Sequence, residues 1–273
     1  MYTYKLMSKV SYGLILVSIL FLLSFTNVFE NNKEPYNNIT IDCVIARYNE
    51  SLDWLMVSEF QHITRFIIYN KGKPITTILP LNATVINIPN VGKCDHTYLY
   101  HIVRNYDNLA DMTIFISGTL RDHRKGPRLK NTIKLVNKTK NSVFIVDKLN
   151  VPHDIYNFSM SYYMSSNPIN QVDEGSIAKL YPANIRPFGK WFEYHWPNQS
   201  TVGAPYTSIF AVHKKHILQH EKKYYISFLE EVSVDVNPEV GHYLERSWLM
   251  IFSPIPPECI YDSNYVWFSI LRQ

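Results

Sequence analysis

Short hydrophobic runs alternate with longer amphipathic stretches from residue 41 onward. Runs of four to six mostly apolar residues, typical of buried strands, occupy residues 43–46, 65–70, 84–89, 112–117 and 142–147. Between them, apolar residues at helical spacing predict helices over residues 51–62 and 97–108. Strands that alternate with helices usually form a parallel sheet. We therefore expect residues 41–273 to be one α/β domain with a mostly parallel sheet flanked by helices.

The N-terminal region has a different pattern, because residues 10–29 are apolar or small and carry no charge. This run is long enough to cross a hydrocarbon core of about 30 Å. Lys5 and Lys9 precede it, so residues 1–9 should stay in the cytosol and the bulk of the chain should face the ER or Golgi lumen. We expect a single-span type II signal-anchor followed by a polar stem at residues 30–40. A cleaved signal peptide is the alternative, although the apolar core of such peptides is usually about 7–15 residues long.

The composition is that of a globular protein that buries a core, with 46% hydrophobic and 18% charged residues. A net charge of +4 falls well short of a nucleic-acid-binding domain, so we expect no nucleic-acid partner. Three cysteines allow at most one disulfide, and no pair of them has zinc-ligand spacing. A lumenal domain would expose Asn-X-Ser/Thr triplets to glycosylation, and such triplets begin at Asn38, Asn82, Asn137, Asn157 and Asn198.

Polar side chains follow the first two predicted strands. Arg47, Asn49 and Glu50 come directly after the first strand, and Asn70 and Lys71 end the second. Ligands of open α/β sheets bind beyond the carboxyl ends of the strands, so we expect these five residues to bind part of a substrate. In the alternative, Asn49 and Glu50 cap the following helix and Arg47 pairs with Glu50.

A second cluster lies at residues 237–248, where Pro238 suits a helix start. Glu239, His242 and Glu245 then follow at spacings of three on one helical face, next to Arg246. We interpret Glu245 or Glu239 as a general base and His242 as a metal or phosphate contact. A salt-bridged charged stripe is the alternative.

Two further blocks have both a binding and a structural interpretation. Lys93 follows Gly92 near a helix start and is a candidate phosphate contact, or Asp95 simply caps that helix. Trp191 and Trp196 lie in an aromatic block suited to stacking on a sugar, or they close the core.

Together, the blocks ARYNE, YNKG, HTYLYHIV, RPFG and NPEVGHYLERSW resemble a family catalogued as a domain of unknown function, known from fungi and large DNA viruses. The opening, a strand, ARYNE, a helix and a strand ending in YNKG, is similar to that of GT-A type glycosyltransferases. This resemblance implies a GT-A-like, Rossmann-like sheet, a nucleotide-sugar co-substrate, Mn or Mg as a divalent cation, and a glycan or glycoprotein acceptor. If the chain is viral, the membrane would be that of the host or the virion.

The metal site of GT-A enzymes is an Asp-X-Asp motif after a strand, and this chain has Arg121, Asp122 and His123 in that place. Asp122 and His123 are therefore candidate metal ligands. Alternatively, Lys71 and Arg121 replace the metal, or the protein is not a transferase. Residues 121–140 carry eight Lys or Arg and one acid, and we expect a solvated or donor-covering loop there.

The sequence predicts a membrane-anchored glycosyltransferase. Its first rival is a catalytically inactive glycan-binding membrane protein with the same fold, and its second is another enzyme on a similar sheet. No Gly-x-Ser-x-Gly, P-loop or His-Glu-x-x-His motif occurs, so serine hydrolases, P-loop NTPases and zincins have no sequence support.

Overall fold

The computed structural model describes residues 39–263, except for residues 57–59, 121–124, 147–152, 165–178 and 202. The expected anchor at residues 10–29 and the stem up to residue 38 lie outside the described residues. Within the described part, no helix is both long and apolar enough to cross a bilayer.

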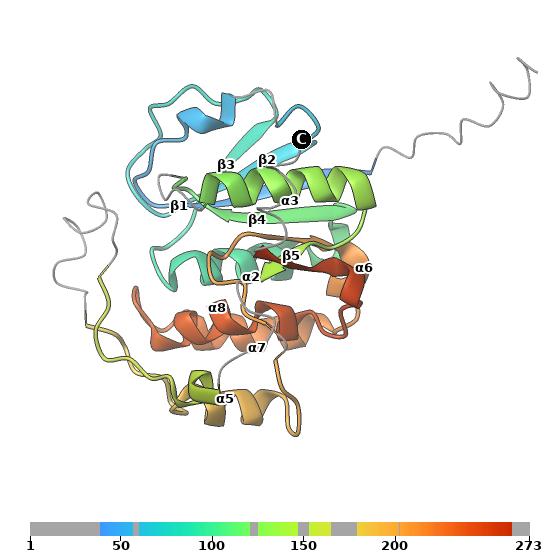
Figure 1. Cartoon of the computed structure of the whole chain (residues 1–273). Helices are drawn as coiled ribbons and strands as arrows, with labels where there is room; N and C mark the ends of the chain where they lie inside the picture. The colour runs from blue at the N-terminus through green and yellow to red at the C-terminus, as the bar shows by residue number, and fades with distance from the viewer. Residues whose placement is uncertain are drawn as a thin grey trace, which may run out of the picture. The chain divides into compact units, whose positions relative to one another are not determined.

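The main sheet has five strands in the order β3-β2-β1-β4-β6. These strands are β1 (Ile41–Arg47), β2 (Arg65–Asn70), β3 (Ala83–Asn87), β4 (Met112–Ser117) and β6 (Phe210–His213). The first four are parallel, and β6 runs antiparallel to β4. The prediction of a mostly parallel sheet flanked by helices is confirmed (Figure 1).

The strand expected at residues 142–147 forms, but it does not join the main sheet. It is β5 (Phe144–Val146), and it pairs in parallel with β7 (Ile260–Asp262) as a separate two-stranded sheet. A bridge between Val143 and Ala211 of β6 connects this small sheet to the edge of the main one.

The helical elements occupy the connections between strands. They are η1 (Asp53–Met56), α2 (Lys93–Asn105), η3 (Tyr106–Asn108), α3 (Lys125–Thr139), η4 (His153–Asn157), α5 (Phe188–His195), α6 (Lys214–Ile217), α7 (Lys222–Val232), α8 (Glu239–Ile251) and η5 (Pro257–Cys259). Where the structure describes the segment predicted as a helix over residues 51–62, residues 53–56 form the 3-10 helix η1 instead of an α-helix, and the Trp54 and Phe60 ring centroids lie 5.6 Å apart.

The basic stretch that we expected to be a loop is mostly helix α3. Leu129, Ile133 and Val136 follow one another at spacings of four and three and are buried, whereas Lys130 and Lys134 are exposed. This amphipathic pattern stabilises a helix against the sheet despite the high charge.

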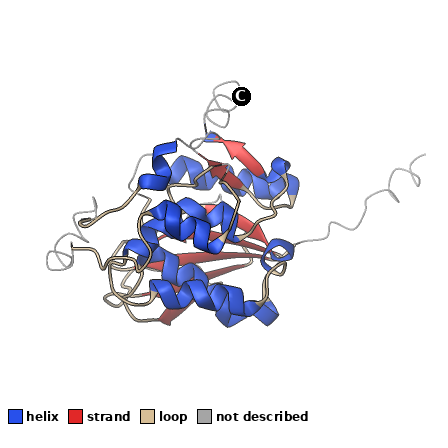
Figure 2. Cartoon of the chain, turned by 90° about the horizontal axis from the view of Figure 1, so that it is seen from below, coloured by secondary structure: helices blue, strands red, loops and turns tan. Residues whose placement is uncertain are grey.

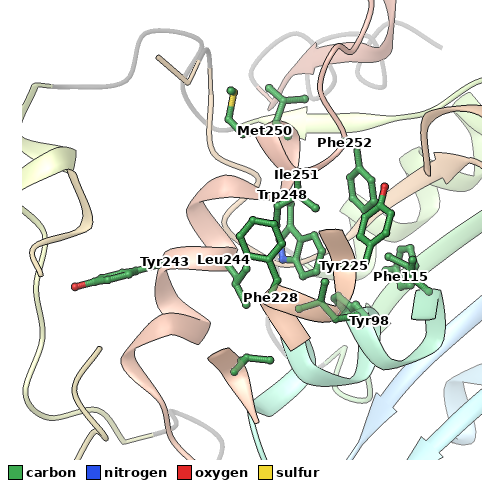
Figure 3. Close-up of a cluster of buried hydrophobic side chains, with 14 of the residues drawn as sticks. Tyr98, Phe115, Tyr225, Phe228, Tyr243, Leu244, Trp248, Met250, Ile251 and Phe252 are labelled. Atoms are coloured by element: carbon green, nitrogen blue, oxygen red, sulfur yellow. The ribbon is translucent and has the colours of Figure 1, made fainter. Parts of the chain in front are cut away.

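Two hydrophobic clusters cover the two faces of the sheet. One contains apolar residues of α3 and of the 52–63 segment, and the other joins α2, α5, α7 and α8. Figures 1 and 2 show the helices distributed over both sides of the strands. The second cluster is rich in aromatic rings, including Tyr98, Phe115 and Trp248, and Figure 3 shows part of it.

The positions of the glycosylation triplets are varied. Asn82, Asn157 and Asn198 are exposed, Asn137 is half-buried in α3, and Asn38 lies outside the described residues. The Asn82 amide nitrogen, which would carry a glycan, donates to the carbonyls of Ile63 and Thr64 at 3.0 and 3.2 Å. All three cysteines are free thiols.

Candidate functional site

The sheet has a topological switch point between β1 and β4. From β1 the chain proceeds to β2 and β3 on one side, and β4 then returns to the other side of β1. At the carboxyl ends of these two strands, the Gly118 N–H donates to Ala46 O at 2.7 Å. A Cβ at Gly118 would lie 3.0 Å from Glu50 Oε2 and 3.2 Å from Ala46 O, so the close approach favours glycine. Such a switch point is where open α/β sheets bind ligands.

A row of polar side chains links the carboxyl ends of three neighbouring strands. Arg47 of β1 donates from Nη1 to Asn70 Oδ1 of β2, and Asn70 Nδ2 donates to Asn87 Oδ1 of β3 at 3.1 Å. Arg47 also donates to Glu50 O at 2.9 Å and to Lys73 O at 2.7 Å. Arg47 and Asn70 are 7% and 4% exposed, so their observed contacts are with the protein itself.

Asn49 and Glu50 extend this row into the next turn. Asn49 Oδ1 accepts from Lys73 N at 2.9 Å, and Glu50 Oε2 accepts from Tyr48 N at 2.7 Å. Arg47 donates to the Glu50 backbone carbonyl, so the expected contact between Arg47 and Glu50 is made through the main chain. Residues of the ARYNE block therefore hydrogen-bond to the backbone of the loops that follow β1 and β2 at the switch point.

Lys71 lies beyond β2 and reaches the start of α2. Its Nζ donates to the carbonyls of Val91 and Lys93. Burial lowers the pKa of Lys71 to about 7, although the charges of Cys94 and Asp95 act in the opposite direction. Lys71 is therefore an amine at the sheet edge whose charge changes near neutral pH.

Helix α2 brings Asp95 to the same edge. Gly92, in the left-handed region with φ 60°, is the N-cap, and Asp95 lies inside the first turn instead of capping it. Asp95 is 4% exposed, and its Oδ1 accepts from the Trp248 indole N–H at 2.9 Å. Burial, followed by the charge of Glu245, raises the pKa of Asp95 to about 7. Asp95 is thus a carboxyl group that exchanges a proton near neutral pH.

Helix α8 faces Asp95 with Gly241, Glu245 and Trp248. A Cβ at Gly241 would lie 3.6 Å from Asp95 Oδ2, which shows how closely the helix backbone passes. Glu245 is half-buried, and its charge raises the pKa values of both Asp95 and Cys94. Glu245, which the sequence predicts as a base, therefore lies within electrostatic range of a second carboxyl group, that of Asp95.

Cations complete the group. Lys125, at the start of α3, donates from Nζ to Ser117 Oγ at 2.9 Å, and its charge acts on Cys94. We define the carboxyl-edge cluster as Lys71, Cys94, Asp95, Lys125 and Glu245. Paired carboxyl groups next to amines suit proton transfer to or from a bound hydroxyl.

Glu239, the other predicted base, has a different environment. It is fully buried, and Oε1 accepts from Met160 N at 2.8 Å and from the Tyr243 hydroxyl at 3.0 Å. Oε2 accepts from Ala183 N at 3.0 Å and pairs with Arg186 Nε at 2.8 Å. Four donors on one carboxylate give Glu239 a structural role, joining α8 to the segments before α5.

The two tryptophans also have structural surroundings. Trp191 and Trp196 are 1% and 6% exposed within the aromatic cluster, and their ring centroids lie 5.7 Å apart. The Trp191 indole donates to Glu231 Oε2 at 2.7 Å. This burial favours the core-closing interpretation over stacking on a sugar.

The remaining predicted residues divide between two regions. His242 and Lys93 both lie beside Tyr163, with the His242 and Tyr163 ring centroids 4.6 Å apart and Lys93 Nζ 6.0 Å from the Tyr163 ring. Arg121, Asp122 and His123 lie outside the described residues. Among the described residues, no group of three or more His, Cys, Asp or Glu side chains could hold a metal ion.

The sequence interpretation missed the role of Asp95 and did not single out Lys125. A signal for Asp95 existed, since it shares a helical stripe with the buried Leu99 and Ile102 at spacings of four and seven. A carboxylate on an apolar stripe indicates a buried charge. Lys125 gives no comparable signal, because it is one of many cations in its segment.

Comparison with known proteins identifies the family of the chain. A family model described as a protein of unknown function (DUF3431) matches residues 43–265, so the chain belongs to that family. No curated protein matches the sequence.

Solved structures give only weak similarities. A mannosyltransferase from Pyrobaculum calidifontis, in complex with GDP-Man and Mn2+, is 11% identical with a TM-score of 0.35, and the match covers 89% of this chain and 64% of that one. A UDP-glucose pyrophosphorylase from Acinetobacter baumanii is 11% identical with a TM-score of 0.30, covering 86% and 100%. TM-scores below 0.5 establish neither a shared site nor a shared function.

Proposed function

We propose that this member of the DUF3431 family is a glycosyltransferase that moves a sugar from a nucleotide-sugar donor to a hydroxyl of a glycan or protein acceptor. The observation that carries the proposal is the pairing of Asp95 and Glu245 at the carboxyl edge of the sheet. Burial and Glu245 raise the pKa of Asp95 to about 7, and Lys71 and Lys125 lie within electrostatic range of the same Cys94 and Asp95 turn. The resemblance of the ARYNE and YNKG blocks to GT-A enzymes supports the same assignment.

The transfer requires one proton to leave the acceptor. As the acceptor oxygen forms its bond to the anomeric carbon, the bond from that carbon to the donor phosphate breaks and the nucleoside diphosphate departs. We assign the acceptor proton to Glu245, because it is the more accessible carboxylate of the pair. Burial and the charge of Glu245 raise the pKa of Asp95, so protonation of Asp95 limits the negative charge that surrounds Glu245.

A divalent cation would neutralise the diphosphate when bound, as in many phosphate-transferring sites. The described residues do not form a three-ligand group for it. Asp122 and His123 stay candidate ligands on sequence grounds, and none of the steps assigned above depends on a metal.

The first test is a thermal-shift screen of the full-length protein with nucleotide sugars, with and without manganese. A ligand at about 100 times its Kd stabilises the folded protein by roughly 2.7 kcal/mol. Stabilisation by one nucleotide sugar, followed by transfer to an acceptor that Glu245→Gln abolishes, would support the proposal. Stabilisation by free glycans alone would instead identify a glycan-binding protein.

The proposed location is a membrane facing the ER or Golgi lumen, with residues 10–29 as a single anchor. The support is the uncharged run and the lysines before it. Protease protection of the C-terminal domain in sealed microsomes checks this topology, and digestion of that domain without detergent would reject it.

A further inference from the structure

Two short extended segments form a small two-stranded patch beside the start of α8. Tyr162 and Lys179 are partners in an antiparallel bridge between these segments. Tyr181 then forms a parallel bridge with Pro238, the residue before α8. The two segments run side by side in Figure 1. The patch is therefore continuous with the helix that carries Glu245.

The patch exposes two tyrosine rings on one face. Side chains of bridge partners lie on the same face of a strand pair, and side chains alternate along each strand. Lys179 and Tyr181 therefore share the face of Tyr162. Leu180 faces the other way and is 3% exposed, whereas Tyr162 and Tyr181 are 59% and 46% exposed. We call Tyr162, Lys179 and Tyr181 the aromatic platform.

Glu239 holds the backbone of the aromatic platform in place. Its Oε1 accepts from Met160 N at 2.8 Å, just before the first platform residue, and its Oε2 accepts from Ala183 N at 3.0 Å, just after the last. Tyr181 adds two backbone hydrogen bonds, donating to Asn237 O at 2.9 Å and accepting from Glu239 N at 2.8 Å. One buried carboxylate thus fixes both segments, and a surface that is already ordered loses less entropy when it binds a ligand.

The aromatic platform is close to the helical turn that carries the proposed base. Tyr163, next to Tyr162, packs against His242 of α8 with ring centroids 4.6 Å apart. Glu245 follows Glu239 by six residues, which is about 9 Å along the helix axis. An oligosaccharide on the platform is therefore near enough to present a hydroxyl to Glu245.

The side chains of the platform suit a carbohydrate. Each tyrosine has an apolar ring face and a hydroxyl, which match the apolar C–H face and the hydroxyls of a sugar ring. Lys179 adds hydrogen-bond donors between the two rings. Among the described residues, three tyrosines have strongly exposed side chains, and two of them share this face, whereas the third, Tyr194, lies on α5. Single exposed rings are ordinary on a protein surface, but two on one fixed face indicate a binding surface.

We propose that the aromatic platform binds the oligosaccharide acceptor, with its two tyrosine rings stacked on sugar rings. The sequence predicts such stacking for Trp191 and Trp196, but both of these side chains are buried. The exposed tyrosines of the platform are available for that contact. Naming the bound glycan as the acceptor rests on the proposed function, whereas the binding of a carbohydrate does not.

A glycan array probed with the full-length protein, followed by calorimetric titration of the oligosaccharide that it identifies, tests the platform. We expect Tyr162→Ala and Tyr181→Ala each to weaken binding about tenfold, because an aromatic anchor supplies a large share of binding energy. Tyr162→Phe, which keeps the ring, should weaken it less. The matched control is Tyr194→Ala, since Tyr194 is 68% exposed on α5, and it should bind like the wild type.

No binding of the wild type to any glycan on the array would overturn the proposal. An unchanged Kd in the double variant Tyr162→Ala, Tyr181→Ala would overturn it as well. Both side chains are exposed, so the variants should fold, and thermal unfolding checks this.

NMR of the wild type with labelled tyrosines gives a second readout that needs no alanine variant. The ring resonances of Tyr162 and Tyr181, assigned from the Tyr→Phe variants, should shift when the glycan is added, and those of Tyr194 should not. Unchanged resonances of both platform tyrosines would contradict the site even if the alanine variants prove unstable.

The outcomes also distinguish this inference from the glycosyltransferase assignment. Glycan binding that depends on Tyr162 and Tyr181, without sugar transfer from any nucleotide sugar, would retain the platform and reject the proposed function. Sugar transfer with an unchanged acceptor KM in the double variant would retain the function and reject the platform.

Discussion

Glu239 and Glu245 are on the same helix, six residues apart, yet they have opposite environments. Six residues turn the helix so that the two side chains point about 120° apart. Glu239 is fully buried under four donors, whereas Glu245 is partly exposed and its charge raises the pKa of the carboxyl group of Asp95. In Figure 3, Tyr243, the partner of Glu239, points away from the side of α8 that carries Trp248, the partner of Asp95. The role of a glutamate on α8 therefore depends on which segments pack against the face of the helix that carries it.

The sharpest test of this difference is Glu239→Gln, which should lower the free energy of unfolding by about 3–5 kcal/mol. The amide would place an N–H₂ group against donors that now bind a carboxylate, and it would leave Arg186 unpaired. Urea denaturation measures the loss. The exposed Glu230→Gln on α7 is the control, and a loss below about 1 kcal/mol would remove the structural role of Glu239.

Asp95→Asn should alter how stability depends on pH, by about 2–3 kcal/mol between pH 5 and pH 8. The raised pKa, about 7 against an ordinary 3.8, means that the native state keeps a proton that the unfolded chain loses. This stabilisation is full below about pH 4 and is lost as the pH rises to about 7.

Unfolding curves of wild type and Asp95→Asn at both pH values isolate the Asp95 contribution, because the other titrating groups are common to the two proteins. The free energy of unfolding of the wild type, relative to that of Asp95→Asn, should be higher at pH 5 than at pH 8. A pH-independent difference would show that Asp95 ionises normally.

Trp248→Phe should reduce stability by about 1–2 kcal/mol and raise the pKa of Asp95 further. The phenyl ring retains most of the packing but cannot donate the 2.9 Å indole hydrogen bond to Asp95 Oδ1. That hydrogen bond lowers the pKa of Asp95, so its loss should raise the pKa. Carbon NMR of the Asp95 carboxyl group follows the titration, and an unchanged pKa would show that the indole does not control it.

Glu245→Gln should have the smallest effect on stability, less than about 1 kcal/mol, because the side chain is partly exposed. The substitution removes a charge that raises the pKa of Asp95, so that pKa should fall. The same carboxyl titration measures the change, with Glu230→Gln as the control. An Asp95 pKa that does not move would place Glu245 outside the carboxyl-edge cluster.

The sheet was predictable from the sequence, whereas its surroundings were less so. Four of the five predicted strands form β1 to β4, because their apolar runs are bounded by polar residues or turns. The strand at 142–147 pairs instead with residues more than a hundred positions later, and local pattern contains no information about such pairing. The α-helix predicted over 51–62 is wrong for residues 53–56, which form a 3-10 helix, and helical spacing of apolar residues does not distinguish the two.

The candidate site was partly predictable for a similar reason. The carboxyl-edge rule brought Lys71 into the site, and helical spacing put Glu239 and Glu245 on α8. Spacing could not show that residues 160, 183 and 186 cover Glu239, or that Asp95 meets Trp248 over 153 positions of sequence.

The free state of the cysteines has a practical consequence. Cys43 and Cys259 are buried and Cys94 is partly exposed, and none is bonded to another. The domain between residues 39 and 263 therefore reaches its fold without an oxidant. Reducing agents have no crosslink between Cys43, Cys94 and Cys259 to break, so the protein should keep its fold when it is purified in their presence.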